Sequence, residues 1–198
     1  MPLKFHHAFV FSSPGAPEAD ALLDAGFLEG ASNVHAGQGT RNRRFFFENG
    51  MLEFLWVCEE SEVQSPAIAH TGLRERSRWR QSGTCPFGIA FEGEPPFPIW
   101  DYRPPYLPEG VAIRVANFST DPAMPFVFVM PGIGKAQQEK VNPRTIESLV
   151  VESVQAPPPF ESERVSFASG SAQLLELRLK GATKKLDLRP GVPVVVEY

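Results

Sequence analysis

The stretch GTRNRRFFFENGMLEFLWV, residues Gly39 to Val57, contains two apolar runs that meet at Asn49-Gly50. An Asn-Gly pair between such runs is the strongest short-range signal for a β-hairpin, because a two-residue type I′ turn needs positive φ at both central positions. We therefore predict that residues 42–48 and 51–57 form an antiparallel pair of strands. Among the Leu, Phe, Trp and Val of the second strand stands one acid, Glu53.

The predicted turn fixes which residues face each other across the hairpin. Residues whose numbers sum to 99 then pair, so Phe47 meets Leu52 and Phe45 meets Phe54. Directly opposed residues share a face of the sheet, so this first face is apolar near the turn. The other face carries Phe46 together with the polar side chains of the hairpin: Thr40, Asn42, Arg44 and Glu53.

This polar row has two interpretations. Burial of a carboxylate is costly and raises its pKa, so a polar row among bulky apolar side chains suits a sheet that lines a cleft. Alternatively the polar face is exposed to solvent, where a diagonal ion pair between Arg44 and Glu53 contributes only ~0–1 kcal/mol. The hairpin alone does not decide between the two.

The rest of the chain alternates strand and helix patterns before it becomes almost entirely β. A short apolar strand (residues 5–12) precedes an amphipathic helix (17–27), and a second helix (65–83) places its arginines on an exposed face. After a strand at 87–93, the segment Pro95–Pro108 holds six prolines and is expected to be an irregular loop. From residue 111 onward strands predominate, which predicts an α+β fold with helices packed on curved antiparallel sheet.

Composition excludes several classes of function. A net charge of −4 and a pI near 5.6 give no electrostatic reason to expect nucleic acid or an anionic membrane surface. No apolar run approaches the roughly 20 residues that span a bilayer. Cys58 and Cys85 are too few for a disulfide framework. These features predict a soluble cytoplasmic protein without a nucleic-acid or membrane partner.

The residues FHHAFVFS, a helix ending in DAGF, and GQGTRNRRFFFENGMLEFLWV together resemble the glyoxalase-like branch of the vicinal oxygen chelate superfamily. The resemblance covers residues 4–58; beyond them only the order of elements agrees. It implies one domain over residues 1–198, built from paired βαβββ modules whose cupped, mostly antiparallel sheets enclose the active site. The first module with its following helix would span residues 4–82, and a divergent, β-rich second module residues 84–198.

The resemblance also implies a set of metal ligands. His7 and Glu53 match the first-module His and Glu, and His7 fits better than His6, which we expect on the opposite face. Imidazole and carboxylate suit Zn²⁺, Ni²⁺, Fe²⁺ or Mn²⁺. The strand CPFGIAFEG departs from the pattern, because Phe87 and Gly88 stand where the second-module His belongs. Glu197, in the closing VVVEY, could serve as a third ligand.

The remaining candidates are judged by their setting. Trp100 and Tyr102, in the proline-rich segment, are candidates for a wall of the cup, since aromatic side chains commonly line pockets; the alternative is that they anchor the loop. His35 and His70 are expected to be exposed. Cys58 and Cys85 are expected to be inert.

Three hypotheses for function follow. In the first, the chain is a metal-assisted lyase, isomerase or dioxygenase acting on a substrate with adjacent oxygens, with His7 and Glu53 on the metal and Glu53 as the catalytic acid or base. Thr40, Asn42, Arg44 and Phe46 would then contact the substrate. In the second, the same cup binds a small molecule without metal. In the third, edge strands mediate interaction with another protein. A homodimer is a further expectation, because modules of this family close a cup within one chain or across a dimer.

Overall fold

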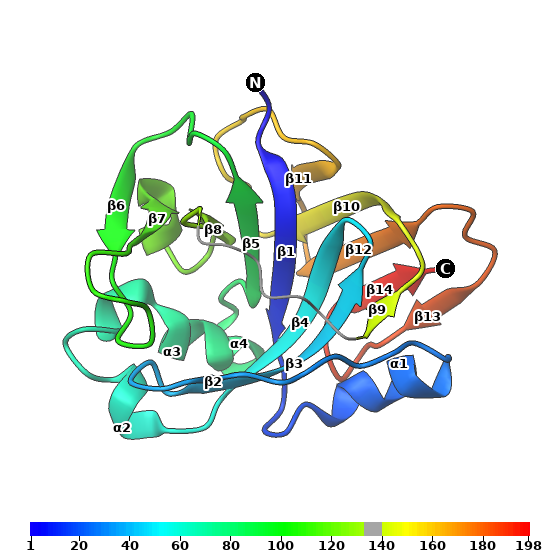
Figure 1. Ribbon diagram of the computed structural model, residues 1–198, viewed down its shortest axis with the longest axis horizontal. Helices are drawn as coiled ribbons and strands as arrows, with labels where there is room; N and C mark the ends of the chain where they lie inside the picture. Colours follow the sequence, from blue (N-terminus) through cyan, green and yellow to red (C-terminus); the bar gives the residue numbers. More distant parts are fainter. Residues whose placement is uncertain (133–139) are drawn as a thin grey trace.

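The computed structural model describes residues 1–132 and 140–198 and has an α+β fold (Figure 1). Short helices lie between strands in the first half of the chain. Two sheets account for most of the structure. The helical elements are η1 (Pro17–Ala19), α1 (Asp20–Asp24), α2 (Glu60–Val63), η2 (Ala69–Thr71), α3 (Leu73–Ser77), α4 (Trp79–Ser82) and η3 (Asn117–Thr120).

The larger sheet is mixed and curls into a half-barrel, with β1 between β4 and β5 (Figure 1). Its strands follow the order β2-β3-β4-β1-β5-β8-β7-β6, and β9 pairs with β3. Pairing is parallel between β1 and β4 and between β5 and β8, and antiparallel between β1 and β5. Its strands are β1 (Lys4–Phe11), β2 (Val34–His35), β3 (Thr40–Phe47), β4 (Gly50–Val57), β5 (Phe87–Glu92), β6 (Ile99–Tyr102), β7 (Ile113–Ala116), β8 (Phe126–Val129) and β9 (Val141–Asn142).

The second sheet holds five strands in the order β11-β10-β12-β14-β13. The structure thus divides the segment 84–198: strands up to residue 129 continue the half-barrel, whereas residues 146–197 form this separate sheet. Its strands are β10 (Ile146–Ser153), β11 (Val165–Ser169), β12 (Leu174–Leu179), β13 (Lys185–Asp187) and β14 (Val194–Glu197).

The hairpin of β3 and β4 forms as predicted, but its turn lies one residue earlier. Glu48 and Asn49 make the turn, Phe47 pairs with Gly50, and Arg44 stands directly opposite Glu53. The predicted type I′ turn at Asn49-Gly50 is therefore wrong, and neither of these residues has positive φ. Because paired numbers now sum to 97 rather than 99, the register moves by two residues and every side chain keeps its predicted face.

Long-range contacts explain why Asn and Gly stand at this turn. The Asn49 side-chain amide donates to the carbonyl of Ile146 at 2.9 Å and accepts from its N–H at 2.7 Å, which ties the hairpin to β10. A Cβ on Gly50 would lie 2.5 Å from the ring of Phe5. Gly50 is therefore required by close packing rather than by its backbone conformation.

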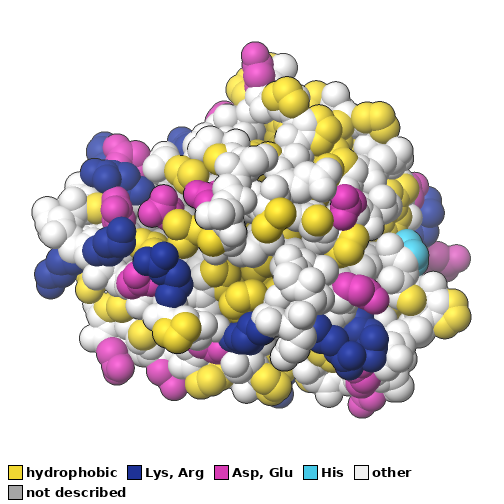
Figure 2. Space-filling model, turned by 180° about the vertical axis from the view of Figure 1, so that it is seen from behind, with side chains coloured by type: hydrophobic (Ala, Val, Ile, Leu, Met, Phe, Trp, Pro, Cys, Tyr) yellow, Lys and Arg dark blue, Asp and Glu magenta, His cyan; other side chains and the backbone are white. Residues whose placement is uncertain are grey.

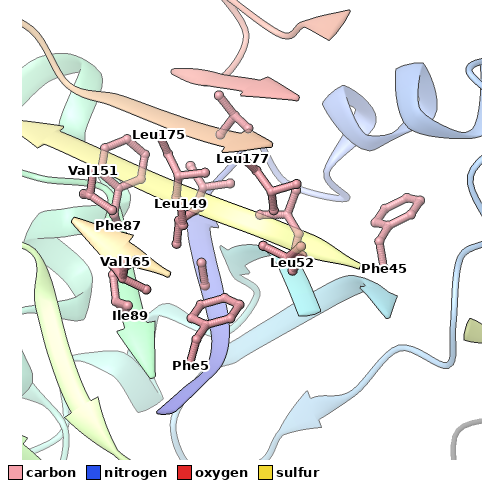
Figure 3. Close-up of a cluster of buried hydrophobic side chains, with 14 of the residues drawn as sticks. Phe5, Phe45, Leu52, Phe87, Ile89, Leu149, Val151, Val165, Leu175 and Leu177 are labelled. Atoms are coloured by element: carbon pink, nitrogen blue, oxygen red, sulfur yellow. The ribbon is translucent and has the colours of Figure 1, made fainter. Parts of the chain in front are cut away.

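One face of the half-barrel packs against the five-stranded sheet, and we call it the core face. Phe5, Phe45 and Leu52 lie on this face (Figure 3). Opposite them lie Leu149 of β10 and Leu177 of β12, both completely buried. Helix α1 covers the same face. Burial of this many large apolar side chains, each contributing roughly 1.5–3 kcal/mol, makes the core face the main source of stability.

The other face, the cavity face, packs against the helical segment 60–82. The predicted helix at 65–83 is broken into short pieces, at Gly72, which adopts a left-handed conformation with φ of 69°, and at Arg78, where the backbone also leaves the helical conformation. Its arginines are not all exposed, contrary to expectation. Arg76 is completely buried and donates hydrogen bonds to five carbonyl oxygens, those of Cys85, Ser119, Asp121, Pro122 and Met124.

The proline-rich segment 95–108 is only partly irregular. Residues 99–102 form β6, the last strand of the half-barrel, which pairs with β7 alone. Pro98 precedes the strand and Pro104 follows it, so no proline interrupts the pairing. The expectation of a wholly irregular loop was therefore wrong for these four residues, since an edge strand needs partners on one side only.

The surface mixes charges of both signs. In Figure 2, basic and acidic side chains are interspersed on the face shown, with apolar atoms between them. Among the residues described, no helix has the length and apolar character needed to cross a membrane.

Candidate functional site

A cavity of about 400 Å³ lies on the cavity face of the half-barrel. Strands β1 to β4 and the loops beside them supply its polar lining, and β7, β8 and α3 supply mainly apolar side chains. The polar lining includes His6, His7, His35, Gln38, Asn42, Arg44 and Glu53, and the apolar lining includes Phe9, Leu55, Leu73, Ile113, Phe126 and Phe128. This composition, an apolar wall with a few convergent polar groups, is typical of small-molecule sites.

Glu53 is buried in this lining, with 5% of its surface exposed. Its Oε1 accepts a hydrogen bond of 2.7 Å from the Asn42 side-chain amide. Burial raises the pKa of Glu53 to about 7, although the bond from Asn42 and the charge of Arg44 both oppose the rise. The carboxyl group is therefore divided between its neutral and ionised forms near neutral pH, so it can both accept and deliver a proton.

His7 stands beside Glu53, with its Nε2 3.8 Å from Glu53 Oε2. Burial lowers the pKa of His7 well below its usual value, and the charges of His6, His35 and Arg44 lower it further. His7 is thus a neutral imidazole at pH 7 and forms no ion pair with Glu53.

His6 lies in the same cavity, contrary to the prediction that it faces the opposite side. A β-bulge between Phe5 and His7 inserts one extra residue in β1 opposite β5, so that both histidines line the cavity. Their Nδ1 atoms are 2.6 Å apart, so one ring donates a hydrogen bond to the other.

Arg44 lies on β3, directly opposite Glu53 of β4, and also lines the cavity. Its Nε donates to the carbonyl of Ala31 at 2.6 Å, and its guanidinium lies over the Phe46 ring at 5.1 Å from the centroid. Burial lowers the pKa of Arg44. Phe46 is not part of the cavity lining. Its ring instead makes a cation–π contact with the Arg44 guanidinium.

A hydrogen-bond network joins the lining residues Tyr102, Gln38 and His35 through Thr40. The Tyr102 hydroxyl donates to Gln38 Oε1 at 2.7 Å, and Gln38 Nε2 donates to Thr40 Oγ1 at 2.6 Å. His35 Nδ1 lies 2.9 Å from the same Thr40 oxygen. Thr40 is completely buried and lies behind the lining, where it positions Gln38 and His35.

His35 and Tyr106 also line the cavity, although sequence reasoning did not place them there. His35, expected to be exposed, is half-buried, and burial lowers its pKa to about 4. Tyr106 lies in the loop after β6 and packs against the His35 ring, with centroids 4.8 Å apart. Only the position of Tyr106 beside Tyr102 in a segment rich in prolines and aromatics gave any signal for it.

Trp100 does not line the cavity. It lies on the outer strand β6 and packs against the exposed His70, with ring centroids 4.8 Å apart. Its indole nitrogen is buried without a hydrogen-bond partner among the described residues. Of the two aromatic residues considered for a wall of the cup, the structure places Tyr102 there and gives Trp100 an anchoring position.

The donors expected for a metal converge only in part. His7 and Glu53 lie side by side, but no third His, Cys, Asp or Glu within the described residues completes a cluster with them. Gly88 on β5 stands where the resemblance places the second-module His. The ring of Phe9 covers Gly88 so closely that a Cβ there would lie 1.9 Å from the ring. Two protein donors are fewer than the three of catalytic zinc sites, so His7 and Glu53 alone do not make up such a site.

Glu197 is not brought to the cavity. It lies in β14 of the five-stranded sheet, and its Oε2 accepts a 2.7 Å hydrogen bond from Arg178. Strand β8 is the equivalent of β4 in the second half of the half-barrel, because β8 pairs in parallel with β5 as β4 does with β1. On its cavity face β8 carries Phe126 and Phe128.

Comparisons with known proteins bear on the fold alone. No family model matches the chain, and no curated protein is similar to it in sequence. Its structure is similar to the crystal structure of a hypothetical protein from Staphylococcus aureus. The two are 12% identical, the similarity covers 100% of this chain and 99% of the other, and the TM-score is 0.53. At this identity the similarity establishes a shared fold.

Proposed function

We propose that this chain binds a small, partly apolar molecule in the cavity of a glyoxalase-like half-barrel. The observation that carries the proposal is Glu53, a buried carboxyl group held by Asn42 in a cavity of about 400 Å³ with an apolar wall. A polar cluster of this kind is costly to bury, so a binding role accounts for it better than stability does.

The strand order supports the expected type of architecture. Strands β1 to β4 and strands β5 to β8 follow the same pairing pattern, with the first strand parallel to the fourth and the third antiparallel to it. This repeat agrees with the paired modules that the resemblance to the vicinal oxygen chelate superfamily implies. The second unit lacks a helix between its first two strands.

Binding is tested through the methionines of the chain. Met51 and Met130 line the cavity, whereas Met1 and Met124 do not. With ¹³C-labelled methionine methyl groups, fragments that occupy the cavity are expected to shift the resonances of Met51 and Met130 and leave Met124 unchanged. If fragments sized for the cavity shift neither resonance, the proposal is wrong.

Proton transfer is a second candidate function, favoured by the pKa of Glu53 near 7. A carboxyl group that titrates at the working pH is well suited to general acid–base catalysis. Hydroxyacetone, which carries adjacent oxygens, provides a test in D₂O. Exchange of its carbon-bound protons, followed by NMR, should be faster with the wild-type protein than with Glu53→Gln; equal rates would exclude catalysis by Glu53 on this probe.

The predicted divalent metal remains a prediction, and elemental analysis of protein purified without chelator tests it. A stoichiometric metal lost in both His7→Ala and Glu53→Gln would favour the metal-assisted hypothesis. Absence of metal in the wild-type protein would favour metal-free binding.

A further inference from the structure

Arg44 is held in place by groups that leave much of its hydrogen-bonding capacity free. The carbonyl of Ala31 uses Nε, and the Phe46 ring supports one face of the guanidinium. Within the described part of the chain, neither Nη1 nor Nη2 makes a hydrogen bond, and Arg44 forms no ion pair with Glu53 although the two residues are opposite neighbours. The site thus contains a positioned cation whose remaining donors are open.

The neighbouring arginine shows the contrast. Arg43 points to the other face of the same strand, where its guanidinium binds Glu29, Asp20 and the carbonyl of Ala16. Arg43 is therefore surrounded by acceptors. Arg44 instead lines the cavity. Among the described residues, no other Lys or Arg side chain lines it.

Tyr106 supplies a second donor to the cavity. Its ring packs against His35, and its hydroxyl makes no hydrogen bond to any described residue. Burial and the charge of Glu53 raise the pKa of Tyr106, so the hydroxyl keeps its proton. His7 and His35, by contrast, are neutral and add no positive charge to the lining.

We infer that the ligand of this cavity carries a planar oxyanion, most simply a carboxylate, which binds the free Nη groups of Arg44 and the hydroxyl of Tyr106. The guanidinium fork matches a carboxylate with two parallel hydrogen bonds. The apolar body of the ligand then lies against Phe126 and Phe128. This inference rests on the proposed binding function and adds the chemical class of the ligand.

A pair of probes that differ in charge tests the inference. Sodium 2-naphthoate and 2-naphthylmethanol share an aromatic body small enough for the cavity, and only the first is an anion. Dissociation constants are measured for each by titration of the Met51 and Met130 methyl resonances and by calorimetry. Naphthoate is expected to bind the wild-type protein at least about ten-fold more tightly than the alcohol, because charged hydrogen bonds are stronger than neutral ones.

Variants assign the preference to particular side chains. Arg44→Met should lose most of the preference for naphthoate while keeping the wild-type affinity for the alcohol, which also shows that it is folded. Arg44→Lys should retain part of the preference, since it keeps the charge and loses the fork. Tyr106→Phe should weaken naphthoate binding several-fold. Arg41→Met, an exposed arginine on the same strand, is the matched control and should behave as wild type.

The possible failures are distinguishable. If both probes shift Met51 and Met130 with equal affinity, or if Arg44→Met keeps the preference for naphthoate, the oxyanion inference is wrong while binding in the cavity stands. If Arg44→Met does not fold, an undiminished preference in Arg44→Lys and Tyr106→Phe overturns the inference. If neither probe shifts the two methyl groups, the inference falls together with the proposed function.

Discussion

Replacement of Glu53 by glutamine should stabilise the protein at alkaline pH. The amide has the shape of the carboxyl group and can still accept the 2.7 Å hydrogen bond from Asn42. Taking the pKa of the carboxyl as 4.5 in the unfolded chain and about 7 in the fold, Glu53→Gln should be more stable than wild type by about 3 kcal/mol at pH 8 and about 1 kcal/mol at pH 5.

The direction follows from proton binding. Because burial raises the pKa of Glu53, the folded state holds this proton more tightly than the unfolded state. The stability that this provides is fully present below about pH 4.5 and is lost as the pH rises through about 7. An uncharged side chain at position 53 does not titrate, so it prevents this loss of stability at high pH.

Urea unfolding of wild type and variant between pH 5 and pH 8 measures the effect. Glu109→Gln, which removes an exposed carboxyl, is the control for the loss of one negative charge. If Glu53→Gln is less stable than wild type at pH 8, the carboxylate is ionised and paired in the fold, and our account of its pKa is refuted. A metal held by Glu53 would give that result, and chelator would then destabilise the wild-type protein.

Other substitutions test the packing around the site by urea unfolding. Gly88→Ala should cost about 1–3 kcal/mol and weaken ligand binding, because the new Cβ would lie 1.9 Å from the ring of Phe9; a neutral result would refute the overlap. Arg76→Met should cost about 3 kcal/mol or more, since five carbonyl oxygens each lose a hydrogen bond, whereas Arg41→Met should be neutral. Asn49→Ala should cost about 1–2 kcal/mol through loss of two hydrogen bonds to β10, and unchanged stability would show that they contribute nothing.

The polar face of the hairpin could be predicted because it depends on parity alone. A strand alternates its side chains between two faces, so a register error of two residues left Asn42, Arg44 and Glu53 together. The exact pairing could not be predicted, because contacts distant in sequence select the turn. Gly50 leaves room for the ring of Phe5, and the sequence around either residue does not indicate that the two are in contact.

Other features of the site also escaped prediction for physical reasons. The bulge that brings His6 beside His7 has no Gly or Pro to mark it, so alternation placed His6 on the wrong face. Alternating patterns identified the C-terminal strands but not the sheet to which each belongs. Glu197 was considered as a third metal ligand only because the resemblance places an acid near the C-terminus, but its strand pairs within the second sheet.

The division of the hairpin into two faces has a consequence for how this protein can change. Even-numbered positions of β3 contact the cavity and its surroundings, and odd-numbered ones near the turn contact the core. If the cavity binds a small molecule as proposed, substitutions at Asn42 or Arg44 should alter its ligand preference, while Phe45 and Phe47 maintain the packing of the core. A library varied at the even positions alone should yield many folded proteins with different ligand preferences, which makes the half-barrel a suitable scaffold for engineered binding.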